Sequence, residues 1–145
     1  MKLDNIIKLR KYFNQYVMAT AIIKRNKKYL LLQRSKHNLT NKYKWQFPEG
    51  GVEFGEKPIK TLERELKEEI NLKLLNAKFL DCTSTKLRYL HQDVYHIIRI
   101  IFLCNVKGKI KLSKEHKAYK WFTKQEIKFL PLIKGLTFNS IKHLL

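Results

Sequence analysis

The sequence predicts an α/β fold in which helices pack against a mixed β-sheet. Apolar, partly β-branched segments alternate with polar stretches, which is the pattern of strands joined by turns. Strands are predicted at residues 17–23, 29–32, 74–85 and 96–106, with residues 86–93 connecting the last two. Between them, residues 58–70 repeat apolar side chains at helical spacing, and strands interrupted by such a helix form a mixed sheet. The whole chain, residues 1–145, is predicted to be a single domain.

The N-terminal third is predicted to contain mostly strands and loops. Residues 1–14 carry apolar side chains among lysines, which indicates a short basic helix or arm. Residues 25–28 are polar and predict a hairpin turn between the first two strands. The polar residues 35–44 predict a loop, and residues 45–47 predict a short strand that ends at Pro48.

A glycine-bearing loop over residues 49–57 is predicted to lead into the main helix. Pro58 suits the first turn of a helix, where its missing N–H has no partner to lose. The apolar stripe of this helix consists of Ile59, Leu62, Leu66 and Ile70. Glu65, Glu68 and Glu69 fall on a neighbouring face. The helix is therefore expected to pack against the sheet and to present carboxylates at its edge.

The C-terminal third predicts one more strand and two short helices. The strand is expected at residues 119–122. Thr123, followed by Glu126 three residues later, forms the pattern of a capping box that opens a helix. Pro131 interrupts this helix, and residues 136–144 predict a C-terminal one.

The charge of the chain favours a polyanionic partner. Lys and Arg total 31 against 12 Asp and Glu, which gives a formal net charge of +19. Such a balance suits nucleotides, polyphosphates or RNA. The alternative is a lysine-rich composition with an ordinary solvated surface, because the lysines are spread along the whole chain.

The composition predicts a cytoplasmic protein. No apolar run approaches the ~20 residues that a membrane span needs, and the apolar pair Ile6 and Ile7 is too short for a secretory signal. Cys82 and Cys104 have no metal-ligand spacing and lie in apolar segments, so buried thiols are expected.

Acidic residues are concentrated in one place. Seven of the twelve fall between Glu49 and Glu69. The i,i+4 pair of Glu65 and Glu69 costs a helix about 0.2–0.5 kcal/mol, so something positive should lie against them. A divalent metal is the leading candidate, because hard cations prefer carboxylate oxygens. The alternative is a solvated helix face with Glu–Lys pairs, and that role is assigned to Glu63 with Lys67.

The acidic region resembles the Nudix box, G-x5-E-x7-R-E-U-x-E-E-x-G-U, in which U is a bulky aliphatic residue. The matching positions are Gly50, Glu56, Arg64, Glu65, Leu66, Glu68, Glu69 and Leu72. The one departure is Asn71 in place of the last glycine. Asn is the usual substitute for Gly in the left-handed conformation that ends a helix, so the departure is mild.

The resemblance implies an α/β/α sandwich and a hydrolase that cleaves a nucleoside diphosphate linked to a group X by attack of water on phosphorus. It implies Mg²⁺ or Mn²⁺ as cofactor, with Glu49, Glu65, Glu68, Glu69 and Glu115 as candidate ligands. At Glu49 the family often uses the backbone carbonyl. It also implies catalytic roles for Arg64, Glu65, Glu68 and Glu115. Arg64 is expected to hold a carboxylate in place by a bidentate pair, with Glu56 as its partner.

Glu115 lies outside the box, six residues before Trp121. In several relatives a loop glutamate at this offset binds metal or acts as general base, and the alternative is an ordinary exposed residue. His116 is expected to be structural, since nothing in the spacing demands a role in proton transfer.

The substrate signals favour a large anionic nucleotide. Residues 45–51 are similar to the strand and loop of Nudix enzymes that trim RNA 5′ ends or cleave dinucleoside polyphosphates. Tyr89 lies where the latter place a tyrosine, on which a base can stack. The other candidate substrate contacts are Arg34, Lys44, Trp45, Arg88 and Arg99. Open alternatives are an oxidised or ordinary nucleoside triphosphate, a nucleotide sugar or ADP-ribose, and a catalytically idle module that binds nucleotide or RNA. Monomer and homodimer also both remain open.

Overall fold

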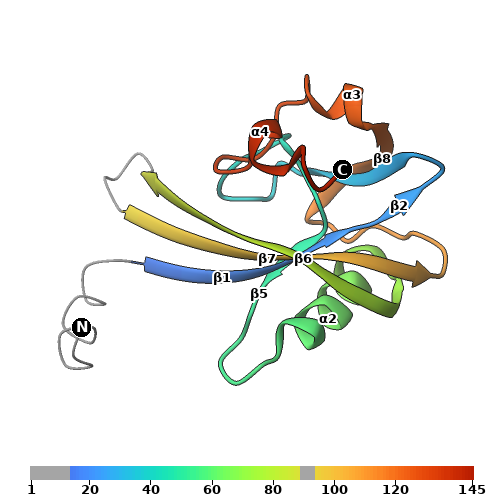
Figure 1. Cartoon of the computed structure of the whole chain (residues 1–145), viewed down its shortest axis with the longest axis horizontal. Helices are drawn as coiled ribbons and strands as arrows, with labels where there is room; N and C mark the ends of the chain where they lie inside the picture. The colour runs from blue at the N-terminus through green and yellow to red at the C-terminus, as the bar shows by residue number, and fades with distance from the viewer. Residues whose placement is uncertain (1–13, 89–93) are drawn as a thin grey trace.

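The computed structural model describes residues 14–88 and 94–145 and arranges its strands in two four-stranded sheets (Figure 1). The first sheet has the order β5 (Glu49–Gly51), β1 (Asn14–Ile22), β7 (Val94–Lys107) and β6 (Lys73–Arg88). In the second sheet, β3 (Lys28–Arg34) pairs with β2 (Lys24–Arg25), β4 (Trp45–Gln46) and β8 (His116–Thr123). The pair β1–β7 is parallel and the other pairs are antiparallel, which confirms the predicted mixed sheet.

The main helix, α2 (Pro58–Ile70), lies against one side of the sheets. Its bounds agree with the prediction, and Asn71 caps it in the left-handed conformation with φ 59° and ψ 29°. Leu62, Leu66 and Ile70 are buried against β1 and the neighbouring strands, as predicted. Ile59, in the first turn of α2, is instead exposed.

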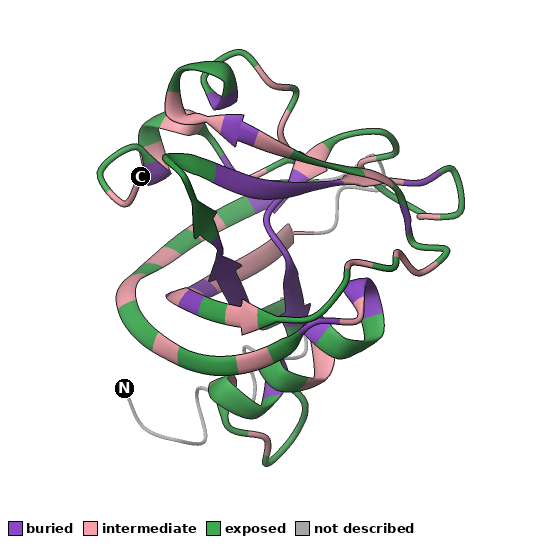
Figure 2. Cartoon of the chain, turned by 90° about the vertical axis from the view of Figure 1, so that its right-hand side faces the viewer, coloured by how far each residue is buried: buried purple, intermediate pink, exposed green. Residues whose placement is uncertain are grey.

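A second core fills the opposite side of the sheets. Two short helices, α3 (Lys124–Ile127) and α4 (Phe138–Ile141), contribute Ile127 and Ile141 to it. The capping box of Thr123 and Glu126 is formed as predicted. Figures 1 and 2 show α2 on one side and α3 and α4 on the other, with the buried residues between them. This arrangement is the α/β/α sandwich that the resemblance implied.

Several predicted boundaries were wrong. Residues 49–51 form strand β5 rather than part of a loop, because they pair with residues 18–20 of β1. Residues 86–88 extend β6, because β7 continues the pairing to Val94. The C-terminal helix is shorter than residues 136–144, since it spans only Phe138–Ile141 after the cap at Thr137. The predicted segment 1–14 lies outside the described residues, except that Asn14 begins β1.

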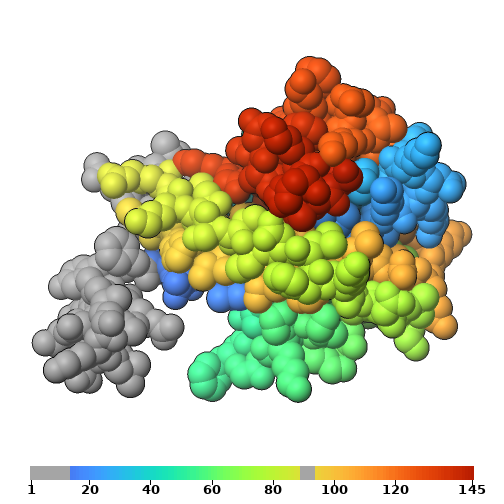
Figure 3. Space-filling model, in the orientation of Figure 1, coloured from blue at the N-terminus to red at the C-terminus, as the bar shows by residue number. Residues whose placement is uncertain are grey.

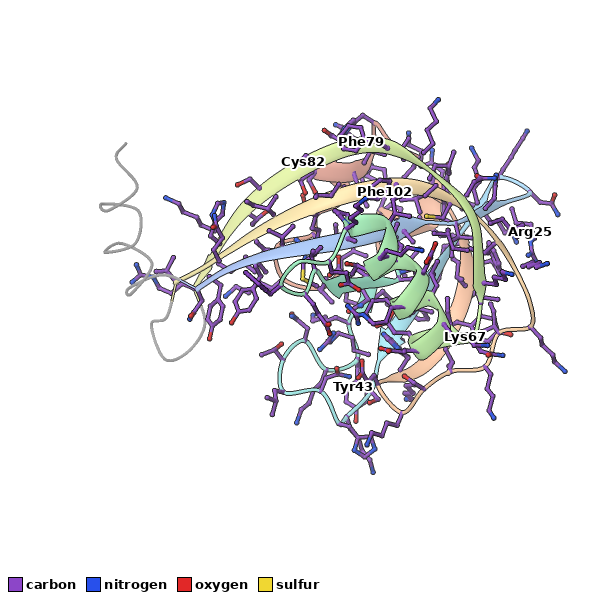
Figure 4. All side chains as sticks on the ribbon, turned by 90° about the horizontal axis from the view of Figure 1, so that it is seen from below. Arg25, Tyr43, Lys67, Phe79, Cys82 and Phe102 are labelled. Carbon is purple, nitrogen blue, oxygen red and sulfur yellow. The ribbon has the colours of Figure 1, made fainter. Side chains whose placement is uncertain are left out.

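The outer surface of the first sheet is formed by β6, which crosses one face of the molecule between the C-terminal segments and the region of α2 (Figure 3). Phe79 on β6 contacts Phe102 on β7 edge to face, with ring centroids 6.1 Å apart (Figure 4). Cys104 is buried as predicted, whereas Cys82 is exposed because its position on β6 points out of the sheet. None of the helices within the described ranges has the length and apolar character that a membrane crossing requires.

Candidate active site

The predicted carboxylates gather around one cavity of about 720 Å³. The cavity lies where α2, β5, the loop after β3 and the segment before β8 meet. Its acidic lining consists of Glu49, Glu65, Glu68, Glu69 and Glu115. Figure 4 views the molecule from the α2 side and labels Lys67 on the helix and Tyr43 on the loop after β3. All five carboxylates proposed from the sequence as metal ligands therefore border a single space, although they are separated by up to 66 positions of chain.

Gly50 makes room for the first of these carboxylates. A Cβ atom at Gly50 would lie 2.0 Å from Cδ of Glu65, and no side chain fits at that distance. The glycine of the box thus leaves room for the side chain of Glu65. It lets the carboxyl group of Glu65 lie directly against the strand.

Arg64 connects α2 to the acidic loop that precedes it, residues 52–57. Its Nε and Nη2 atoms donate to the two carboxylate oxygens of Glu56, at 3.1 and 3.0 Å, which is the bidentate pair predicted from the sequence. Nη2 also donates to the carbonyl of Gly51, and Nη1 donates to Glu65. The hydrogen bonds from Arg64, Glu53 and Thr61, in this order, lower the pKa of Glu56 to about 2. The same carboxylates raise the pKa of Arg64, so this pair stays charged at neutral pH.

Among the carboxylates that line the cavity, Glu69 has the least compensation for a negative charge. It is buried, with 6% of its surface exposed, and its Oε2 atom has no hydrogen-bond partner among the described residues. Desolvation raises its pKa well above the ordinary value, and the negative charges of Glu65, Glu115 and Glu49 add to this effect. The positive charge of Arg34 opposes this pKa shift, but its effect is smaller than that of each of the three glutamates. Desolvation also raises the pKa of Glu65, against the hydrogen bond from Arg64.

These observations show that the site suits a cation. A buried oxygen without a partner, surrounded by further carboxylates, is the environment in which a hard cation replaces missing hydrogen bonds and cancels repulsion. In the described ranges, no three Asp, Glu, His or Cys side chains are already close enough together to ligate one ion. Part of the reason is that Glu65 is turned toward Arg64. The carboxylate of Glu68 lies 3.6 Å from Nη1 of Arg64, and its side chain is 62% exposed.

Glu49 differs from the other carboxylates because its side chain is fully engaged. Arg99 donates to both of its oxygens, at 2.9 and 3.3 Å, and the Thr20 hydroxyl donates at 2.9 Å. Both carboxylate oxygens of Glu49 therefore already accept hydrogen bonds, and only its backbone carbonyl remains a candidate metal ligand. Arg99, considered above as a phosphate contact, is 2% exposed and is instead the partner of Glu49.

Of the predicted substrate contacts, the structure places Arg34 at the cavity. Its guanidinium donates to the Thr40 carbonyl and to the side chain of Gln46. The other three described candidates do not line it. Trp45 packs edge to face on Phe122 in the second core, while Lys44 and Arg88 are exposed elsewhere. Tyr89 lies outside the described residues.

Among the residues of the cavity wall that sequence reasoning missed, two can carry a positive charge, His37 and Lys114. Both residues reach the cavity because β3 pairs with β8. This pairing brings the segment after β3 and the segment before β8 side by side. Backbone bonds tie them further, since Ser35 N–H donates to the Glu115 carbonyl at 2.9 Å. The cavity thus has Glu65, Glu68 and Glu69 on the α2 side, whereas Arg34, His37 and Lys114 lie on the loop side together with Glu115.

His116 lies directly behind Glu69. It is 5% exposed, its Nε2 atom is 3.8 Å from Oε1 of Glu69, and neither ring nitrogen has a hydrogen-bond partner among the described residues. Desolvation, followed by the charge of Arg34, lowers the pKa of His116 to about 4. The ring is therefore neutral at pH 7, and its contact with Glu69 is not an ion pair.

Comparison with known proteins extends these observations. The NUDIX domain family model matches residues 15–142. The "8-oxo-dGTP diphosphatase" of Buchnera aphidicola subsp. Schizaphis graminum is 33% identical over 119 residues, which cover 82% of this chain and 83% of that protein. The "RNA pyrophosphohydrolase" of Ectopseudomonas mendocina is 47% identical over 49 residues, covering 34% of this chain and 31% of that one.

Solved structures share the fold. The MutT NUDIX hydrolase from Burkholderia pseudomallei superposes with a TM-score of 0.76 at 21% identity, covering 91% of this chain and 99% of that one. The MutT protein from Methanosarcina mazei Go1 superposes with a TM-score of 0.73 at 25% identity, covering 90% and 93% of the two chains.

Proposed function

Because this chain belongs to the NUDIX family and is a hydrolase of nucleoside diphosphates linked to a group X, we propose that it cleaves the polyphosphate of a nucleoside 5′-polyphosphate. The observation that carries this proposal is Glu69, a buried carboxylate with an unpartnered oxygen among further carboxylates at the cavity. Such a site binds the cation that a polyphosphate substrate brings or needs.

Nudix hydrolases generally use divalent metals, and we propose Mg²⁺ or Mn²⁺ held by Glu65, Glu68 and Glu69, with Glu115 and the Glu49 carbonyl as further ligands. When bound, such an ion neutralises phosphate charge and lowers the pKa of the attacking water. Arg64 keeps Glu65 in place through its bonds to the acidic loop. Glu115 is exposed and lines the cavity, which supports the proposal that it accepts a proton from water as a general base.

The opposite wall supplies the phosphate contacts. Arg34, His37 and Lys114 line the cavity on the side of the loop after β3 and the segment before β8, away from α2. A guanidinium and an ammonium suit phosphate oxygens. The polyphosphate is therefore proposed to lie between the two walls, which orients the phosphorus atom for attack.

Two classes of substrate could supply this polyphosphate. A free nucleoside triphosphate, with either an ordinary or an oxidised base, is favoured by the relative named 8-oxo-dGTP diphosphatase, because the similarity covers 82% of this chain. A dinucleoside polyphosphate or a 5′-triphosphate RNA is favoured by the net charge of +19 and by the shorter match to an RNA pyrophosphohydrolase.

The test is a turnover panel with Mg²⁺, at low and high salt, with products identified by mass. The panel contains 8-oxo-dGTP, dGTP, diadenosine tetraphosphate, triphosphorylated RNA and ADP-ribose. We expect a polyphosphate to be cleaved with the highest kcat/KM, and the efficiency to fall with salt because the phosphate contacts are screened. A preference for ADP-ribose that is insensitive to salt would contradict the proposal. Binding without turnover of any member would identify an idle binding module instead.

A further inference from the structure

We propose that His116 is a positioning residue for Glu69. Its ring N–H donates to one carboxylate oxygen of Glu69 and so leaves the other oxygen directed at the cation. This inference rests on the proposed metal site, because Glu69 needs a fixed orientation only if it is a ligand. Metal-binding carboxylates are generally held by such outer hydrogen bonds, which set the direction of the ligand atom.

The first observation is that two buried polar groups face each other with nothing else to bind. Glu69 and His116 are 6% and 5% exposed. Among the described residues, the buried side-chain nitrogen and oxygen atoms without a hydrogen-bond partner are Oε2 of Glu69 and both ring nitrogens of His116. Buried polar groups normally have partners, and an unsatisfied one needs an explanation. Three such atoms in one contacting pair indicate a site that is completed by a ligand.

The second observation is that backbone hydrogen bonds hold Glu69 close to the segment that leads into His116. The Ser113 N–H donates to the Glu69 carbonyl at 2.8 Å, and the Lys111 N–H donates to the Ile70 carbonyl at 3.0 Å. The segment before β8 is thereby tied to the last turn of α2. Nε2 of His116 lies 3.8 Å from Oε1 of Glu69. A small side-chain rotation is then enough to close a hydrogen bond, whose usual N···O length is about 2.9 Å.

The third observation is an irregularity in the sheet at this position. Gln33 pairs with Ala118, but the next residue of β3, Arg34, pairs with His116, so that β8 carries one extra residue. A bulge of this kind re-aims a side chain and is common beside active sites. Here it accompanies a buried His116 next to an exposed Lys117.

The other described histidines are not buried without partners in the way that His116 is. His37 is exposed to solvent. His96 bonds to Gln15 and Ser84, and His143 bonds to Asp81. An ordinary core histidine would likewise have a partner for its ring nitrogens. The carboxylate closest to the ring of His116 in the described ranges is Glu69.

The test measures metal binding directly, without nucleotide. Mn²⁺ is titrated into the wild type, His116→Phe, His116→Gln and the matched control His143→Gln, and free Mn²⁺ is followed by electron paramagnetic resonance. We expect His116→Phe to weaken Mn²⁺ binding about 10–100-fold, the usual effect of losing an outer-shell partner. His116→Gln keeps an N–H donor of similar reach and should restore most of the affinity. His143→Gln, on the distant Asp81 pair, should bind as the wild type does.

Unchanged affinity in His116→Phe would overturn the proposal, as would equal losses in His116→Phe and His116→Gln, because then no donor is involved. Should His116→Phe fail to fold, the wild type still decides. Its ¹⁵N-labelled ring nitrogens should shift when Mg²⁺ saturates the protein, and ring signals that stay in place would overturn the proposal. A wild type that binds no Mn²⁺ would refute the metal site itself and, with it, the role of His116.

Discussion

Two buried glutamates border the same cavity and differ in what surrounds them. Glu49 on β5 accepts hydrogen bonds from Arg99 and Thr20, and a buried cation thus compensates its charge. Glu69 on α2 has an unpartnered oxygen among the described residues and three neighbouring carboxylates. Burial alone therefore does not identify a ligand. The absence of a compensating cation within the protein does, because the missing charge has to come from outside.

The largest effect is expected at the compensated glutamate. Arg99→Met leaves the charge of Glu49 buried without a compensating cation, and such a change costs about 3–5 kcal/mol of unfolding free energy. Urea denaturation measures this. The double variant Glu49→Leu/Arg99→Met removes both charges and should be more stable than Arg99→Met alone. If the single variant were as stable as the wild type, the pair would not have the structural role assigned to it.

The uncompensated glutamate should behave in the opposite way. Glu69→Gln removes one of several repelling carboxylates, so the melting temperature without metal should stay the same or rise. Turnover should fall at least about 100-fold, since even outer-shell changes cost about 10–100-fold in metal affinity or activity. Thermal melts and steady-state rates with Mg²⁺ check both parts. Glu63→Gln, an exposed position on the same helix, is the matched control and should keep the wild-type rate.

Glu115 tests whether exposure weakens the effect. It lines the same cavity but is exposed, so water already compensates its charge. Glu115→Gln should lower the rate by about 10-fold, less than Glu69→Gln, which corresponds to the lower end of outer-shell effects. The measurement is the turnover rate of Glu115→Gln and of the wild type over a range of pH. A profile identical to that of the wild type would make Glu115 an ordinary loop residue.

The smallest effect is expected for an exposed, satisfied carboxylate far from the cavity. The hydrogen bond from His143, followed by the backbone N–H of Cys82, lowers the pKa of Asp81 below its ordinary value of 3.8. Since the folded-state pKa is the lower one, the stabilisation is complete above the unfolded value and is lost as the pH falls through the folded one. Asp81→Asn should slightly lower the melting temperature at pH 6, and the difference should shrink below pH 3.8. If the difference in melting temperature between Asp81→Asn and the wild type were the same at pH 6 and below pH 3.8, it would contradict the hydrogen bond between Asp81 and His143.

The sequence predicted the helical part of the site well. The bounds of α2, its first-turn proline and the left-handed Asn71 all agree with the structure. So does the pairing of Arg64 with Glu56. These features depend on residues close together in the chain, so spacing and side-chain type are enough to specify them.

Predictions that depended on distant partners were less successful. Strand β5 was taken for a loop, because its pairing residues on β1 are about thirty positions away. Arg99 was considered as a phosphate contact, although it is separated from Glu49 by 50 positions and is buried with it. Trp45 was expected at the substrate, but β8 brings Phe122 against its ring.

The sequence by itself determined the family, the mixed α/β fold and the acidic residues, because the box places fixed side chains at fixed offsets along one loop and one helix. Only the tertiary structure decided which carboxylates are free. The pairing of β1 with β5 and β7 gave Glu49 its arginine, and the pairing of β3 with β8 placed a buried histidine behind Glu69. The physical reason is that the charge state and ligand capacity of a buried carboxylate depend on its neighbours in space, and the pairing of distant strands chooses those neighbours.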